Sequence, residues 1–111
     1  MLAIPIRTSL LLDEIRFLAW VDQANPGDRL EYHRGFMAID TDKMMSKLSP
    51  DQRRVLCDLA DAAFRAAMKD LVHLVKARLA TNHFAYIAVA RAKPKSAPAS
   101  LSSLLLEARA A

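Results

Sequence analysis

The sequence predicts a single α+β domain, and three observations carry that prediction. The chain has 111 residues, of which 53% are hydrophobic and 25% are charged, a composition typical of one compact globular domain. Apolar residues recur at helical spacing in residues 9–24 and 50–70. Residues 71–79 and 84–91 are rich in strand-forming residues and flank a short polar turn, which predicts a β-hairpin.

The first predicted helix runs from an N-cap at Thr8 or Ser9 to about Ala24. Residues 1–7 are expected to be extended, because Pro5 cannot sit in a helix interior. Residues 25–28 end the helix, since Pro and Gly at its centre suit a type II turn. The helix presents an apolar stripe to the core, made of Leu11, Ile15, Phe17, Leu18 and Val21.

Residues 29–39 are predicted to form a strand whose inner face includes Leu30 and Tyr32. Gly35 interrupts this segment and predicts either a β-bulge or a close backbone approach. Asp40 or Thr41 is then expected to cap a short helix that runs through residue 48.

The segment Ser49–Gln52 is the clearest local signal in the chain. Ser49 is an N-cap residue, Pro50 suits the first helical position, and Gln52 can close a capping box. The helix is expected to reach about Asp70, because no glycine or proline follows for many residues. Its predicted inner face consists of Val55, Leu59, Ala62, Ala63 and Ala66, flanked by Leu56 and Phe64.

A domain boundary is predicted near Arg91, so that residues 1–91 form the domain and residues 92–111 form a flexible linker and a short amphipathic tail. Pro94 and Pro98 lie in a stretch without any core-forming period. A tail helix this short is marginal alone and must dock on its own domain or on a partner to be ordered. Its apolar side would carry Leu101, Leu104, Leu105 and Ala108.

The order of predicted elements is helix, strand, two helices and β-hairpin, which resembles a winged-helix domain over about residues 9–91. That resemblance implies that the hairpin turn is the wing. A second resemblance rests on the segment PGDRLEYHRGF at residues 26–36, followed by residues 72–75 and 84–86. These segments are similar to a group of short, uncharacterised proteobacterial and prophage-type proteins. This second resemblance implies a bacterial or phage accessory protein and supplies no activity.

Composition excludes several classes of protein. Cys57 is the only cysteine, so the chain can form neither an internal disulfide nor a thiolate-rich zinc site, and a cytoplasmic location is expected. The apolar run at residues 10–12 meets Asp13 at once, which is too short for a signal peptide or a membrane span. With two glycines, the chain cannot build a glycine-rich phosphate loop.

No group of residues predicts catalysis, a metal site or a cofactor. The three histidines lack the spacing of metal ligands, and Cys57 lies among apolar residues, where a thiol is usually inert. Arg34, next to His33 and Gly35, is a weak candidate for binding an anion. We therefore expect a protein that is not an enzyme and that uses no small-molecule cofactor.

The distribution of charge favours either a polyanion or an acidic protein surface as the partner. Residues 1–70 carry 10 basic and 11 acidic side chains, whereas residues 71–111 carry six basic and one acidic side chain, so the two parts have net charges of −1 and +5. Asp58 and Asp61 would repel phosphates from the centre of the long helix, so its start and the hairpin are expected to make the contacts. The candidate residues for binding duplex DNA are Gln52, Arg53, Arg54, Lys76, Arg78, Lys93 and Lys95.

The leading hypothesis is therefore a small, non-enzymatic DNA-binding or regulatory accessory protein. The alternative is a protein-interaction module that binds another protein, or itself as a homodimer, without binding nucleic acid. The nearly balanced charge of residues 1–70 and the leucines of the tail favour this alternative.

Overall fold

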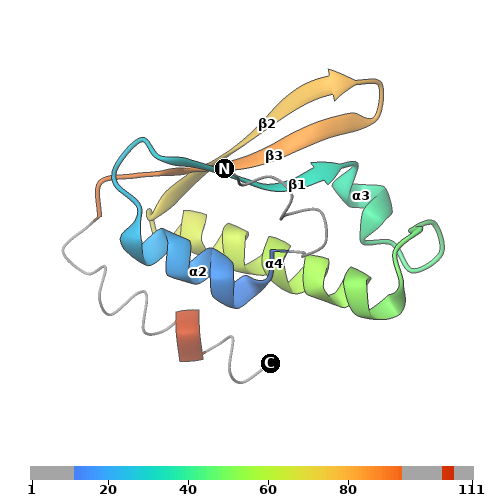
Figure 1. Ribbon diagram of the computed structural model, residues 1–111, viewed down its shortest axis with the longest axis horizontal. Helices are drawn as coiled ribbons and strands as arrows, with labels where there is room; N and C mark the ends of the chain where they lie inside the picture. Colours follow the sequence, from blue (N-terminus) through green and yellow to red (C-terminus); the bar gives the residue numbers. More distant parts are fainter. Residues whose placement is uncertain (1–11, 94–103, 107–111) are drawn as a thin grey trace, which may run out of the picture.

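The computed structural model describes residues 12–93 and 104–106. Figure 1 shows two layers, in which a three-stranded sheet lies against two long helices that cover only one of its faces. The helices are α2 (Glu14–Gln23) and α4 (Pro50–Met68), and the strands are β1 (Arg29–Gly35), β2 (Val72–Ala80) and β3 (His83–Ala90). A short helix, α3 (Met37–Asp40), follows β1. The prediction of an α+β fold is confirmed.

The sheet is antiparallel, and its strand order is β1-β3-β2, so the last strand in the sequence lies at the centre. The predicted hairpin is confirmed: β2 pairs with β3 from Val72 opposite Ala90 to Ala80 opposite His83. Asn82 adopts the left-handed conformation, with φ of 53°, which asparagine tolerates better than most residues. The pairing of β1 with β3 contains an irregularity between Glu31 and His33.

Helix α2 begins later than predicted. Its N-cap is Asp13, whose carboxylate accepts a hydrogen bond of 2.8 Å from the backbone N–H of Arg16, so a start at Thr8 or Ser9 is wrong for this helix. Aspartate is at least as good an N-cap as serine or threonine, and its charge suits the positive end of the helix dipole. Residues 1–11 lie outside the described residues. Phe17, Leu18 and Val21 are buried as predicted, whereas Ile15 is exposed.

The segment after β1 differs most from the prediction. The strand ends at Gly35 instead of Ile39. Helix α3 ends at Asp40 instead of starting after it, so neither Asp40 nor Thr41 caps a following short helix. Gly35 has a φ of +147°, which an L-residue rarely adopts, and a Cβ added there would clash with the carboxylate of Asp40. The close backbone approach predicted at Gly35 is confirmed, and the bulge lies at Tyr32 instead.

Helix α4 forms as its capping signal predicts. The hydroxyl of Ser49 accepts a hydrogen bond from the backbone N–H of Gln52, and the Gln52 side chain accepts one from the backbone N–H of Ser49, both at 3.1 Å. Phe64 is 60% exposed, so it does not flank the core as expected. The buried side chains of α4 are those of Leu56, Leu59, Ala62, Ala63 and Ala66.

The core lies between the sheet and the two long helices, and it includes a residue from the tail. Leu104 is fully buried and belongs to the same cluster as Phe17 and Leu59. This leucine therefore docks on its own domain, whereas Leu105 and Leu106 are exposed. Residues 94–103 and 107–111, which include Leu101, Ala108 and the two prolines, lie outside the described residues.

Candidate functional site

The start of α4 and the turn of the β2–β3 hairpin lie at the same end of the molecule, with α3 between them (Figure 1). A hollow of about 610 Å³ lies at this end, and both the hairpin turn and the loop before α4 contribute to its lining. The hairpin turn contributes Asn82 and His83, and the loop before α4 contributes Met45, Lys47 and Leu48. We call this depression the end hollow. Its remaining lining comes from β1 and α3 and consists of His33, Arg34, Gly35, Phe36, Ile39 and Asp40.

A hydrogen-bonded pair of side chains forms one wall of the end hollow. His33 Nε2 lies 2.7 Å from Oδ2 of Asp40, and the same oxygen accepts a hydrogen bond of 3.1 Å from the backbone N–H of Phe36. The Tyr86 ring lies 5.7 Å from the His33 ring, and the Tyr86 hydroxyl accepts a hydrogen bond from the backbone N–H of Met37. The pair is therefore fixed in place by contacts to β3 and to the backbone of the α3 segment.

The end hollow contains no serine or cysteine that this pair could activate as a nucleophile. Within residues 12–93 and 104–106, no three histidine, cysteine, aspartate or glutamate side chains come together as metal ligands.

Arg34, the candidate anion-binding residue, lines the end hollow but is already engaged. Its guanidinium donates two hydrogen bonds to Glu31, from Nε at 3.0 Å and from Nη2 at 2.8 Å. These hydrogen bonds and the charge of Glu31 raise the pKa of Arg34. An incoming anion would therefore have to compete with the Glu31 carboxylate for this side chain.

Lys76 and Arg78 lie on one face of the hairpin, because they pair with Tyr86 and Phe84 at alternate positions of β3. Both residues are exposed. The Lys76 ammonium lies 4.7 Å from the centre of the Phe84 ring, a cation–π contact that holds the side chain along the strand. Neither residue forms an ion pair with a carboxylate in the part of the chain that the structure describes.

The candidate residues at the start of α4 are in different situations. Gln52 uses its side-chain oxygen in the capping box, and Arg54 lies 3.9 Å from an oxygen of Asp51. Arg53 is half-buried and has no ion-pair partner among the described carboxylates. Asp61 is exposed on the same helix. The start of α4 therefore carries two arginines, of which Arg54 is exposed.

Lys93 does not lie at this end of the molecule. The Lys93 ammonium donates a hydrogen bond of 2.9 Å to the backbone carbonyl of Ala24, just beyond the end of α2, at the opposite end from the hairpin turn (Figure 1). Lys93 thus helps to satisfy a helix C-terminus. Lys95 lies outside the described residues.

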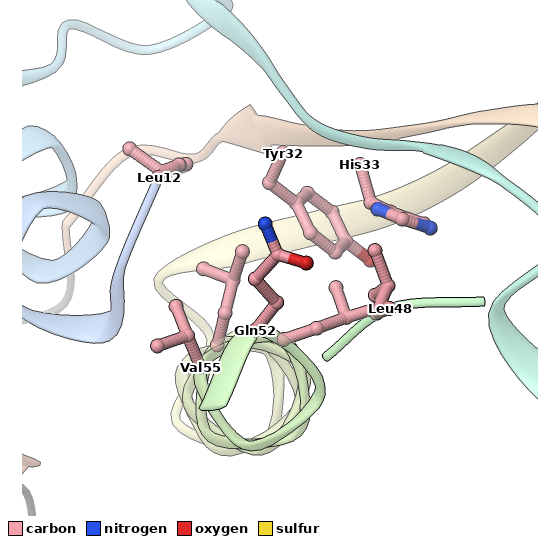
Figure 2. A pocket seen from close by; sticks show the side chains of 8 residues that line it. Leu12, Tyr32, His33, Leu48, Gln52 and Val55 are labelled. Carbon is pink, nitrogen blue, oxygen red and sulfur yellow. The ribbon is translucent and has the colours of Figure 1, made fainter. Parts of the chain in front are cut away.

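A small cavity beside the end hollow was not predicted. It has a volume of about 60 Å³ and lies between β1 and the first half of α4, as Figure 2 shows. His33 and Leu48 line both the cavity and the end hollow. Partial burial, followed by the charge of Tyr86, raises the pKa of Tyr32. The cavity is lined by Leu12, Tyr32, His33, Leu48, Gln52, Val55, Leu56 and Leu59.

Sequence reasoning missed this cavity because its lining comes from four separate segments, each of which has the pattern of an ordinary core segment. No contact between these segments is encoded in the local sequence. Strand alternation predicts that Tyr32 and His33 lie on opposite faces, so no signal in the sequence indicated that both line the cavity.

Comparison of the chain with protein families, with curated proteins and with solved structures finds no match. Among the described helices, none is long and apolar enough to span a lipid bilayer. Function is therefore argued from the side chains of this chain alone.

Proposed function

We propose that this protein is a winged-helix-like accessory protein that binds duplex DNA with the end formed by the start of α4 and the β2–β3 hairpin. The order of helices and strands supports the fold assignment, and so does a hairpin that directly follows the longest helix. In this proposal the hairpin is the wing, and α4 points its start toward the DNA. The protein is a cytoplasmic, non-enzymatic regulator of bacterial or phage type.

The observation that carries the proposal is the placement of Lys76 and Arg78. They lie on the same face of an exposed strand, without an ion-pair partner among the described carboxylates, and at the same end as Arg53 and Arg54. Basic side chains from two separate elements can therefore reach the same stretch of phosphate backbone. Phosphate contacts of this kind supply most of the affinity for duplex DNA.

Two features indicate that binding depends on the backbone of DNA more than on its sequence. Helix α3 is a single turn, and nine residues separate it from α4, so the pair does not form the compact helix-turn-helix of a sequence-reading domain. Asp61 and Phe64 are exposed on the middle of α4 and do not suit a groove lined by phosphates. We therefore expect weak discrimination between DNA sequences.

A titration with a fluorescent duplex tests this proposal. Binding should weaken by orders of magnitude between about 50 mM and 200 mM salt, because phosphate contacts release counterions. The double variant Lys76→Ala/Arg78→Ala should bind at least about tenfold more weakly, and its slope of log affinity against log salt should be smaller by about two.

The matched control is Arg16→Ala/Arg29→Ala, which removes the same charge from α2 and from the start of β1. Its affinity for DNA should fall much less. A protein that does not bind the duplex at low salt, or two double variants that lose the same affinity, would overturn the proposal.

The alternative function, a protein-interaction module, is favoured by one observation on α4. Phe64 and Met68 are one helical turn apart and are 60% and 69% exposed. Large apolar side chains in such numbers on one helix face often contact another protein. If the chain forms a homodimer through this face, sedimentation should show a dimer that Phe64→Ser/Met68→Ser converts to a monomer. A wild-type monomer at high concentration would exclude this mode.

A further inference from the structure

We infer that the free edge of β2 binds an extended segment of a partner protein in which acidic residues alternate with apolar residues. The segment adds to the sheet as a further strand beside β2. This site goes beyond the proposed contact with DNA, because it uses the backbone of β2 and the open face of the sheet as well as basic side chains.

Strand β2 lies at an edge of the sheet, since the strand order β1-β3-β2 leaves it with β3 as its one neighbouring strand in the described part of the chain. No residue of β2 forms a hydrogen bond with a described residue outside β3. Residues 75–80 are all exposed, so both faces of this half of the strand are open to solvent. Such an edge is a template for another extended segment.

The charge of the hairpin selects an acidic segment. Residues 71–91 contain no aspartate or glutamate. Lys76 and Arg78 point to the same face of β2, and neither forms an ion pair with a carboxylate in the described part of the chain. In an added strand, acidic side chains at alternate positions would lie beside these two cations, and such cross-strand pairs of opposite charge stabilise a sheet.

The opposite face of β2 selects apolar residues at the positions between. Val75 pairs with Ile87, and both lie on the face opposite to Lys76, which is the face that α2 and α4 leave uncovered (Figure 1). Val75 is 42% exposed. An apolar side chain on the added strand would lie beside Val75 and remove part of this surface from water. The partner segment should therefore alternate acidic and apolar residues.

A second copy of this chain does not suit the same edge. Antiparallel pairing of two β2 strands centred on Lys76, Ala77 or Arg78 would place basic side chains of the two copies opposite each other. Like charges that are directly opposite destabilise a pair of strands. The charges that disfavour pairing of β2 with itself thus favour pairing with an acidic segment.

A bound segment would cover Lys76 and Arg78, so it would compete with DNA for these side chains. This competition rests on the proposed function, whereas the binding of the segment does not. The segment would then act as an inhibitor of DNA binding.

A peptide titration with the full chain tests the site. The probe is a fluorescent peptide of nine residues, the length of β2, in which Glu and Val alternate. It should bind at least about tenfold more tightly than a peptide with the same residues grouped in two blocks, because only alternation places the acidic side chains on one face. Equal affinities of the two peptides, or no binding of the alternating peptide, would overturn the inference.

Methylation of the peptide backbone separates strand addition from simple attraction between charges. In an added strand the N–H groups of alternate residues face β2, and those of the residues between face solvent. Two peptides are therefore compared, each methylated at one of the two sets of alternate nitrogens. One should lose binding and the other should keep most of it, and equal affinities of the two would contradict strand addition.

A charge swap locates the peptide on β2. Lys76→Glu/Arg78→Glu should weaken binding of the Glu–Val peptide at least about tenfold and should bind the corresponding Lys–Val peptide instead. The matched control is Arg16→Glu/Arg29→Glu, which reverses two exposed charges outside the hairpin and should have a much smaller effect. Equal effects of the two double variants would place the peptide elsewhere on the protein.

The strand site and the proposed function can fail separately. Arg53→Ala/Arg54→Ala should weaken DNA binding and leave peptide binding within about twofold of the wild type. A protein that binds the peptide but no duplex would remove the proposed function and keep the strand site, and the reverse result would remove the strand site alone. A peptide that binds without displacing the duplex would exclude the competition.

Discussion

One carboxylate fastens α3 to β1: Oδ2 of Asp40 lies 2.7 Å from Nε2 of His33 and also accepts the backbone N–H of Phe36. Both side chains of the pair are largely shielded from water, with exposures of 16% for His33 and 26% for Asp40. This contact sets the position of α3 and hence the shape of the end hollow.

Removal of that carboxylate should destabilise the fold. Asp40→Ala leaves His33 Nε2 and the Phe36 N–H without their acceptor, which should cost about 1–3 kcal/mol in the free energy of unfolding. Chemical denaturation measures this cost. The control is Asp42→Ala, which removes an exposed carboxylate that accepts the Met44 N–H and should cost less. Equal costs would show that the His33–Asp40 contact contributes nothing.

Substitution by alanine should change the stability of the protein by different amounts at the two glycines. Both have positive φ, but a Cβ at Gly35 would collide with the Asp40 carboxylate, whereas a Cβ at Gly27 would meet nothing within 4 Å. Gly35→Ala should therefore destabilise the protein by more than about 1 kcal/mol, and by more than Gly27→Ala. In thermal melts the reverse order would contradict the described geometry of β1 and α3.

The tail should contribute to stability through one leucine. Leu104→Ala empties a fully buried position and should cost about 2–5 kcal/mol. Leu106, two residues later, is 65% exposed, so Leu106→Ala should change stability by less than about 0.5 kcal/mol. Denaturant melts of the two variants would give equal midpoints only if Leu104 did not lie in the core.

Two substitutions at the N-cap of α4 should have different effects on the stability of the protein. Ser49→Ala removes the hydroxyl that accepts the Gln52 N–H and should cost about 1 kcal/mol. Ser49→Asp keeps an acceptor at the N-cap and adds a negative charge at the positive end of the helix dipole, so its stability should stay close to that of the wild type. Urea denaturation at one pH is sufficient to compare them.

The pKa of Glu14 should make the stability of the protein depend on pH. Partial burial, followed by the charge of Asp58, raises the pKa of Glu14 above its ordinary value, although Arg65 lies 3.7 Å away. The folded state therefore holds the Glu14 proton more tightly than the unfolded state, and stability from this group is lost as pH rises through its titration range. Glu14→Gln should be more stable than the wild type at pH 7.

This advantage of the Glu14→Gln variant should shrink when denaturation is repeated near pH 4, where Glu14 gains its proton. Asp22→Asn, on the same helix and fully at the surface, controls for the change in net charge. An advantage that grows at low pH would contradict the direction of the shift.

The sequence predicts those elements whose signals are local. The capping residues Ser49 and Gln52 begin α4, and the turn around Asn82 closes the hairpin, because each signal acts over a few residues. The start of α2 was misplaced because Thr8, Ser9 and Asp13 are all acceptable N-caps, and local propensity does not rank them. The end of β1 was misplaced because the chain turns at Gly35 to bring it against the Asp40 carboxylate. The alternation of apolar and polar residues does not reveal this turn.

The candidate site was predicted only in part for the same reason. Charge selected Lys76 and Arg78 from the sequence. The structure adds that both lie on one face of β2, because residues two apart on a strand share a face. The docking of Lys93 on Ala24 spans 69 residues, and the cavity under β1 joins residues from 12 to 59, so neither follows from any local pattern.

The strand order has a consequence for the way in which the chain folds during synthesis. β1 and β2 do not pair with each other. Each pairs with β3, which is synthesised after both of them. The nascent chain thus carries two strands with unsatisfied backbone groups until residues 83–90 leave the ribosome, and Leu104 completes the core later still. Ribosome-bound chains that stop before His83 should therefore lack the pairing that joins β1 and β2 to the described sheet.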